Sequence, residues 1–284
     1  MLCYYEFMDE FAKEYFQKLK ALAYDFEDRR FELAKSRIKM FAAAIGRQLI
    51  EFDDTFDLLM GAGNSGLYMT KIAEMTYEYL NTSVPKILNI PIIRFKEDGK
   101  TLNDNSFLLL KVKEELRNVA PIKNVLFVDD EIMRAITAKE CFTLLLKTYS
   151  NMSHLDATVI AENHFFEWHY KLPKVSLRFF AYSPLIQWLN ANISYFIPQG
   201  FYHEISKQIE GVSSYNQAMA IIVGGALKRK DSNENPYFDY KVWEILKQKI
   251  PNYEERGTTL VKGLRELVKQ GVDDYKTGKI SFRF

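Results

Sequence analysis

Short apolar runs alternate with longer segments of helical periodicity through the middle of the chain. The apolar runs have the length and the β-branched content of buried strands. These predicted strands cover residues 56–60, 87–95 (interrupted by Pro91), 125–128, 157–161 and 175–181. Between them the spacing predicts helices over residues 67–80, 107–117 and 137–146. Because strands alternate with helices, we expect an α/β fold with a twisted parallel sheet and right-handed crossovers.

Both ends of the chain show helical periodicity without strands. Apolar residues recur at helical spacing in the N-terminal part, and further helices are predicted over residues 202–209, 215–227, 241–249 and 258–270. A polar stretch at residues 228–236 predicts a loop or an internal linker. We therefore predict three parts: an N-terminal helical segment (1–52), an α/β core (53–185) and a mostly helical C-terminal region (186–284).

Two acidic residues, Asp129 and Asp130, directly follow the apolar strand at residues 125–128. In open parallel sheets, ligands bind outside the carboxyl ends of the strands, which is where these side chains would lie. Two adjacent carboxylates repel each other unless a metal ion, a proton or a pair of sugar hydroxyls shares their charge. The pattern therefore predicts a ligand site at this edge of the sheet.

The sequence VDDE at residues 128–131 resembles the end of the first strand in response-regulator receiver domains. Such a domain also needs a phospho-acceptor aspartate at the end of a later strand. Neither predicted later strand ends in Asp, and no Asp occurs between Asp156 and Asp231. We therefore exclude the receiver interpretation.

The longer stretch VLFVDDEIMRAIT, residues 125–137, resembles the signature of type I phosphoribosyltransferases. In that family an apolar strand and two acids precede a short loop that usually ends in Thr-Gly-x-Thr before a helix. The resemblance covers the strand, both acids, Ile132 and Thr137. It departs where Met133, Arg134 and Ala135 replace the usual Thr-Thr-Gly. The implied fold is the twisted parallel sheet of the type I phosphoribosyltransferases with helical additions at both ends.

Three glycines lie in the segment GAGNSG, residues 61–66, between a predicted strand and a predicted helix. Glycine lets backbone N–H groups approach an anion, and the helix N-terminus adds a partial positive charge. The segment is not a P-loop, because no Lys-Ser/Thr follows at the required distance. Taken alone it also fits a tight strand–helix turn, but its position resembles the pyrophosphate-binding loop of the family.

The charged segment RFKEDGK, residues 94–100, follows the second predicted strand. It is similar to the start of the flexible catalytic loop in several members of the family. The resemblance makes Arg94 or Lys96 the pyrophosphate contact and puts Lys100 on the mobile part of that loop. Without the other two motifs it would be interpreted as a solvated charged loop.

Together the three motifs imply a binding site for phosphoribosyl pyrophosphate (PRPP) and Mg²⁺. The implied pyrophosphate contacts are Ala62, Gly63, Asn64, Ser65 and Arg94. The implied 5′-phosphate contacts are Arg134, Ala135, Ile136 and Thr137. The implied catalytic residues are Asp129, Asp130, Lys96 and Lys100. The two aspartates would bind the ribose hydroxyls, serve as ligands for Mg²⁺ and stabilise positive charge at the anomeric carbon.

Composition narrows the remaining classes of partner. The net charge of +1 gives no reason to expect nucleic acid or an anionic membrane surface as a partner. No run approaches the ~20 apolar residues of a membrane span, and the acidic N-terminus lacks the features of a signal peptide. The only cysteines, Cys3 and Cys141, form no disulfide framework, and His164 and His169 lack an evident third zinc ligand. We expect a cytoplasmic protein whose partners are PRPP and a nucleobase-like small molecule, with a homodimer left open.

The expected function is Mg²⁺-dependent transfer of ribose 5-phosphate between pyrophosphate and a nitrogenous base. The rival hypothesis is a regulatory protein that binds PRPP or a nucleotide on the same fold and has lost transferase activity. The changed residues Met133, Arg134 and Ala135 and the large C-terminal region favour the rival.

Overall fold

The sheet of the computed structural model contains five parallel strands. The structure describes residues 27–52, 54–92, 105–130, 136–149, 152–161, 172–181, 192–209, 212–226 and 240–282. The strands are β1 (Leu58–Ala62), β2 (Lys86–Ile90), β3 (Asn124–Val128), β4 (Leu155–Ala161) and β5 (Val175–Ala181). Their order across the sheet is β2-β1-β3-β4-β5. The predicted α/β fold with a parallel sheet is therefore confirmed.

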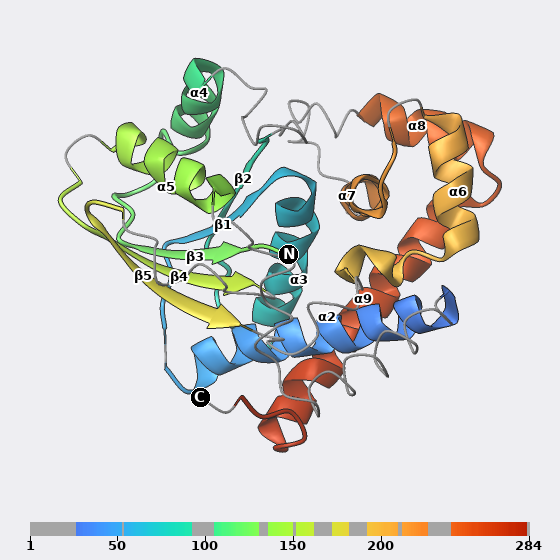
Figure 1. Cartoon of the computed structure of the whole chain (residues 1–284), viewed down its shortest axis with the longest axis horizontal. Coiled ribbons are helices and arrows are strands. Elements are labelled where there is room, and N and C mark those ends of the chain that lie inside the picture. Colours follow the sequence, from blue (N-terminus) through green and yellow to red (C-terminus); the bar gives the residue numbers. More distant parts are fainter. Residues whose placement is uncertain are drawn as a thin grey trace, which may run out of the picture.

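Helices cover both faces of the sheet (Figure 1). On one face lie α4 (Asn105–Glu115) and α5 (Ile136–Thr148), and on the other lie α2 (Glu27–Ile50) and α3 (Gly63–Tyr79). Successive strand residues point to opposite faces, so Leu58 and Met60 pack with the α4–α5 layer while Leu59 packs with the α2–α3 layer. Burial on both faces explains why the strands appear as continuous apolar runs.

The C-terminal region is mostly helical, as predicted. It contains the 3-10 helix η4 (Ile193–Phe196) and the helices α6 (Gln199–Gln208), α7 (Tyr215–Ala226), α8 (Tyr240–Lys249) and α9 (Tyr253–Lys276). These elements share one hydrophobic cluster with α2, α3 and one face of the sheet. The boundaries predicted at residues 52 and 185 therefore lie within a continuous core, and their status as domain limits stays a prediction.

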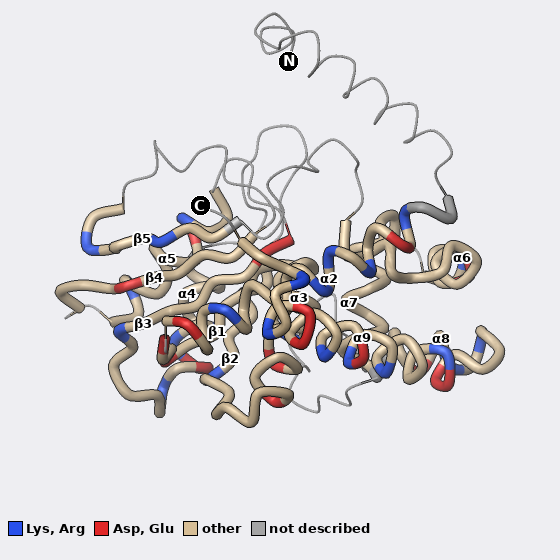
Figure 2. The backbone as a smooth tube through the Cα atoms, turned by 90° about the horizontal axis from the view of Figure 1, so that it is seen from below, with Lys and Arg blue, Asp and Glu red and all other residues tan. Residues whose placement is uncertain are grey.

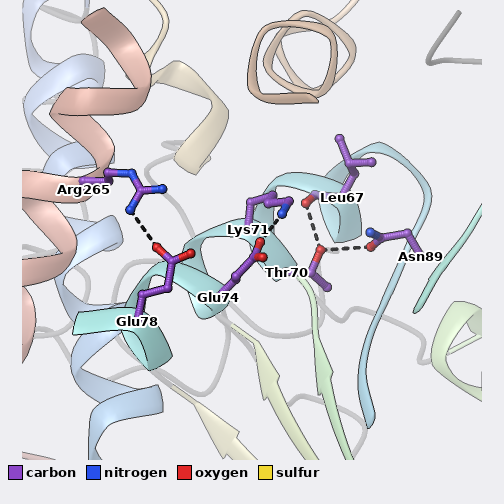
Figure 3. A network of polar contacts seen from close by, with 7 residues as sticks. All are labelled: Leu67, Thr70, Lys71, Glu74, Glu78, Asn89 and Arg265. Carbon is purple, nitrogen blue, oxygen red and sulfur yellow. Dashed lines mark hydrogen bonds and ion pairs between the residues drawn. The ribbon is translucent and has the colours of Figure 1, made fainter. Parts of the chain in front are cut away.

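Helix α3 lies between the sheet and the C-terminal region and contacts both. On one side Thr70 donates a hydrogen bond to Asn89 of β2, with 3.0 Å between the oxygen atoms. On the other side Arg265 of α9 pairs with Glu78 at 2.6 Å, and both contacts are visible in Figure 3. The orientation of α3 is thus fixed against both neighbours.

The second strand ends earlier than predicted. Residues 87–95 were expected to form one strand, but β2 ends at Ile90 and the chain turns there, with Ile92 N–H donating to the Ile90 carbonyl at 2.8 Å. Pro91 has no N–H to donate to a neighbouring strand, so it cannot continue a ladder on that side. The predicted strand at residues 87–95 is therefore wrong in its bounds, since β2 covers Lys86–Ile90.

Acidic and basic residues are interspersed along the described chain, including along α8 and α9 (Figure 2). This mixture agrees with the small net charge of the sequence. No helix in the described part of the chain combines the length and the apolar character needed to cross a membrane.

Candidate functional site at the carboxyl edge of the sheet

The turn between β1 and α3 contains no separate loop, because the strand ends at Ala62 and the helix begins at Gly63. A Cβ atom on Gly61 would lie 2.5 Å from the carbonyl oxygen of Gly66, so these two backbones are in direct contact. Gly63 has φ of +60°, a conformation that favours glycine. The three glycines are therefore required by the turn. The N-cap residue of α3 is Ala62, which makes no side-chain cap hydrogen bond to the first N–H groups of the helix.

The acid pair, Asp129 and Asp130, lies at the carboxyl end of β3, next to this turn. Only 6% of Asp129 and 8% of Asp130 is exposed. Ser65 Oγ donates a hydrogen bond to Asp129 Oδ1 at 2.8 Å, and the Asp130 N–H donates to the same oxygen at 3.0 Å. Strands β1 and β3 are neighbours, and the chain reverses its direction across the sheet between them, which is where ligands bind in doubly wound folds.

Burial raises the pKa of the Asp129 carboxyl well above its usual range, and the adjacent charge of Asp130 and a hydrogen bond between the two side chains raise it further. The hydrogen bonds from Ser65 Oγ and from the Asp130 N–H act in the opposite direction. Full ionisation of the acid pair is therefore unfavourable at this buried position. A ligand that supplies hydroxyl donors or positive charge would relieve this cost.

Asp130 is held by a second group of residues, which we call the Asp130 cluster: Tyr68, Asn192 and Asn216 around the carboxylate. Both asparagine side chains donate from Nδ2 to Asp130 Oδ2, Asn216 over 3.4 Å and Asn192 over a shorter distance. Tyr68 Oη lies 3.1 Å from the same oxygen. Tyr68 follows Ser65 by three residues on α3, so both side chains reach the acid pair from one face of the helix.

The Tyr68 hydroxyl has three acceptor atoms within reach in the Asp130 cluster and one proton to donate. Tyr68 Oη lies 3.0 Å from the Oδ1 atoms of both Asn192 and Asn216 but carries a single proton. Asn192 Oδ1 already accepts from the Ser194 N–H at 3.0 Å. In the described part of the chain, Asn216 Oδ1 has no donor other than Tyr68. We therefore assign the Tyr68 proton to Asn216, which leaves both amide N–H groups for Asp130.

Tyr68, Asn192 and Asn216 were not among the predicted site residues. The spacing of Tyr68 from Ser65 on a predicted helix was an available signal. The two asparagines come from η4 and α7, and no local pattern connects them to the acid pair.

The predicted site residues fall into two groups. The structure brings Ala62, Gly63, Asn64 and Ser65 together with Asp129 and Asp130. Ile136 and Thr137 begin α5, so the predicted helix N-terminus after the acid pair is present. The remaining predicted residues, Arg94, Lys96, Lys100, Arg134 and Ala135, lie outside the described residues. The ligand roles of both groups stay predictions.

A metal ion would find two carboxylates at this edge. Among the residues that the structure describes, no group of three or more His, Cys, Asp or Glu side chains is arranged to hold a metal ion. Mg²⁺ is commonly bound by one or two carboxylates together with substrate phosphates and water. Asp129 and Asp130 would supply the carboxylate part of such a shell.

A second polar cluster, His154, Asp156 and Ser176, lies at the opposite edge, where β4 and β5 begin. Its composition is that of a Ser-His-Asp triad, but both Asp156 and Ser176 contact the same nitrogen, His154 Nε2, at 3.1 and 3.0 Å. In a working triad the acid orients Nδ1 while Nε2 takes the serine proton. These exposed side chains are therefore not arranged for nucleophilic catalysis.

Comparisons of the chain with protein-family models, with curated proteins and with solved structures give no match.

Proposed function

We propose that this protein binds PRPP at the carboxyl edge of the sheet. We further propose that it transfers ribose 5-phosphate between pyrophosphate and a nitrogenous base in the cytoplasm, as the type I phosphoribosyltransferases do. The hydrogen bond from Ser65 Oγ to Asp129 Oδ1 supports this function most directly. It joins the glycine turn at residues 61–66 to the acid pair. The sequence resemblance connected these two motifs only through their order along the chain.

The chain's own groups account for most of the proposed binding. The uncapped N-terminus of α3 presents backbone N–H groups to the pyrophosphate, and the N-terminus of α5 presents them to the 5′-phosphate. The carboxylates of Asp129 and Asp130 accept hydrogen bonds from the ribose 2′ and 3′ hydroxyls. As the bond to pyrophosphate breaks, the same carboxylates stabilise the positive charge that develops at the anomeric carbon.

Bound Mg²⁺ would neutralise part of the pyrophosphate charge as that group leaves. Asp129 and Asp130 would contribute to holding the ion. Because the pair is buried, a cation would also lower the cost of ionising both carboxyl groups.

The second candidate is a regulatory protein that binds PRPP or a nucleotide without turnover. One observation favours it: Asp130 Oδ2 already receives hydrogen bonds from two asparagine side chains of the C-terminal region. A carboxylate held in this way can recognise a ligand without being free to follow a changing transition state. The replaced loop residues Met133, Arg134 and Ala135 point in the same direction.

The two candidates are separated by an assay for pyrophosphate release from PRPP and Mg²⁺, run against a panel of purines, pyrimidines and related bases. For an enzyme, Asp130→Asn should lower turnover about 10²-fold, because the charged contact matters most in the transition state. Asp156→Asn is the matched control, since its side chain is 61% exposed at the opposite edge of the sheet. It should retain full activity.

PRPP binding followed by isothermal titration distinguishes the remaining outcomes. Tight binding with no pyrophosphate release for any base supports the regulatory protein. An absence of both binding and release would contradict the phosphoribosyltransferase-like function in either form.

A further inference from the structure

We infer that Asn192 and Asn216 are positioning residues for the acid pair, so that the C-terminal helical region completes the ligand site. For the identity of its ligand, PRPP, this inference rests on the proposed function. The positioning itself can be tested on the protein without ligand.

The Asp130 cluster gathers groups from distant parts of the chain onto one carboxylate oxygen. Tyr68 comes from α3 of the α/β core, Asn192 precedes η4, and Asn216 lies in the first turn of α7. Their separations from Asp130 are 62, 62 and 86 residues. The C-terminal region therefore supplies two of these three contacts.

Both asparagines are themselves fixed, which is what a positioning role requires. Asn192 caps η4, because its Oδ1 accepts from the Ser194 N–H. That bond determines which side of the amide faces the core, so Nδ2 points to Asp130. Asn216 is oriented through its Oδ1 by Tyr68 Oη at 3.0 Å. Neither amide can rotate without breaking a hydrogen bond.

Fixing one oxygen of Asp130 also constrains the rest of the acid pair. A carboxylate held at Oδ2 by donors from separate elements cannot turn about its side-chain bonds without losing them. The backbone N–H of Asp130 donates to Asp129 Oδ1, and the N–H of Asp129 donates to the Ile160 carbonyl of β4. The orientation of Asp130 is therefore coupled to that of Asp129 and to the end of β3.

The test uses Asn192→Ala and Asn216→Ala in the full chain, each compared with Tyr79→Phe. Tyr79 lies on α3, about 16 Å along the helix from Tyr68, and donates to Asp273 of α9 at 2.7 Å. The control thus removes another polar contact between α3 and the C-terminal region, away from the acid pair. A merely structural role for the asparagines would give the same pattern of effects as this control.

Two measurements are made on each variant. In amide hydrogen exchange without ligand, both asparagine variants should exchange severalfold faster than wild type at Asp129 and Asp130, and Tyr79→Phe should not. In PRPP titrations with Mg²⁺, affinity should fall about tenfold for the asparagine variants, as for the outer-shell partners of a binding carboxylate, and remain unchanged for Tyr79→Phe.

A variant of nearly the same volume separates loss of the hydrogen bond from loss of side-chain volume. Asn216→Asp replaces the Nδ2 donor with a second carboxylate against Asp130, so it should increase exchange at the acid pair as the alanine variants do.

Unchanged exchange at the acid pair in both alanine variants would overturn the inference. A wild-type protein that does not bind PRPP would contradict the proposed function instead, and the exchange measurement would still decide whether the asparagines position the acid pair.

Discussion

Two of the contacts between the C-terminal helices and the rest of the molecule are built on opposite principles. Where α9 crosses α2, a Cβ atom on Gly271 would lie 2.3 Å from the carbonyl oxygen of Lys39, so the contact depends on the absence of a side chain. At the Asp130 cluster, α7 and the segment before η4 place polar side chains around a buried carboxylate. The first contact is close backbone packing, and the second is a network of hydrogen bonds.

The two contacts differ in what they contribute: the first to stability and the second to ligand binding. Close apolar packing contributes to folding and leaves no chemistry at its surface. Burying a carboxylate pair lowers the stability of the fold. Residues that are retained despite such a loss of stability are frequently those that act on a ligand. Variants at the helix crossing should therefore change stability alone, whereas variants at the acid pair should change ligand binding and the pH dependence of stability.

The largest expected effect on stability comes from Gly271→Ala. Overpacking a well-packed site costs about 1–3 kcal/mol, while replacing glycine by alanine inside a helix returns about 1 kcal/mol. The crowded atoms belong to the backbone of Lys39 and cannot rotate away, so the upper end of the overpacking range applies. We therefore expect a net loss of about 2 kcal/mol in the free energy of unfolding. Urea unfolding measures it, and PRPP affinity of the folded variant should be unchanged.

Gly200→Ala is the control for this variant. Gly200 is in the first turn of α6, and a Cβ atom there would meet nothing within 4 Å. Only the gain in helix propensity remains, so this variant should be equal to wild type or slightly more stable. Equal stability of the two alanine variants would contradict close packing at the helix crossing.

The next largest effect on stability is expected for Asp129→Asn, and it depends on pH. The pKa of Asp129 is raised in the folded protein, first by burial and then by Asp130, so the folded state holds this proton more tightly than the unfolded chain does. Wild-type stability should therefore decrease as the pH rises from about 4, the pKa of an unfolded aspartate, through the higher pKa of the folded state. The substituted asparagine cannot ionise and still accepts from Ser65, so the variant should avoid this loss.

Thermal unfolding in a chelating buffer without ligand tests the effect. The melting temperature of Asp129→Asn should be close to that of wild type at pH 4 and above it at pH 8. A difference that is constant over this range would show that ionisation of Asp129 carries no folding cost.

The sheet and the acid pair could be predicted because their signals are local. Strands buried on both faces give continuous apolar runs, and Asp129 and Asp130 directly follow one of these runs. Their place at the carboxyl edge then follows from the geometry of parallel sheets. The early end of β2 at Ile90 was also encoded locally, by Pro91, and was missed because the apolar residues on both sides were given more weight.

The Asp130 cluster and the helix crossing could not be predicted in this way. Asn192 and Asn216 are ordinary polar residues in a helical region, and their meeting with Asp130 depends on how that region folds back onto α3. Gly271 lies within a regular helical pattern, where nothing in the neighbouring residues indicates a second backbone at contact distance. Both features require tertiary structure, which a periodic pattern does not contain.

The smallest expected effect comes from Arg265→Met, at a contact that belongs to neither class. Arg265 and Glu78 join α9 to α3 at 2.6 Å, but their side chains are 48% and 43% exposed (Figure 3). Water and salt screen an ion pair of this kind, so its loss should cost no more than about 0.5 kcal/mol. Methionine keeps most of the apolar stem, which confines the change to the charge.

The loss, measured by urea unfolding, should shrink further when the salt concentration is raised, because the attraction is screened. A cost near that of Gly271→Ala, or one independent of salt, would show that this exposed pair and not the close packing at Gly271 holds α9 in place.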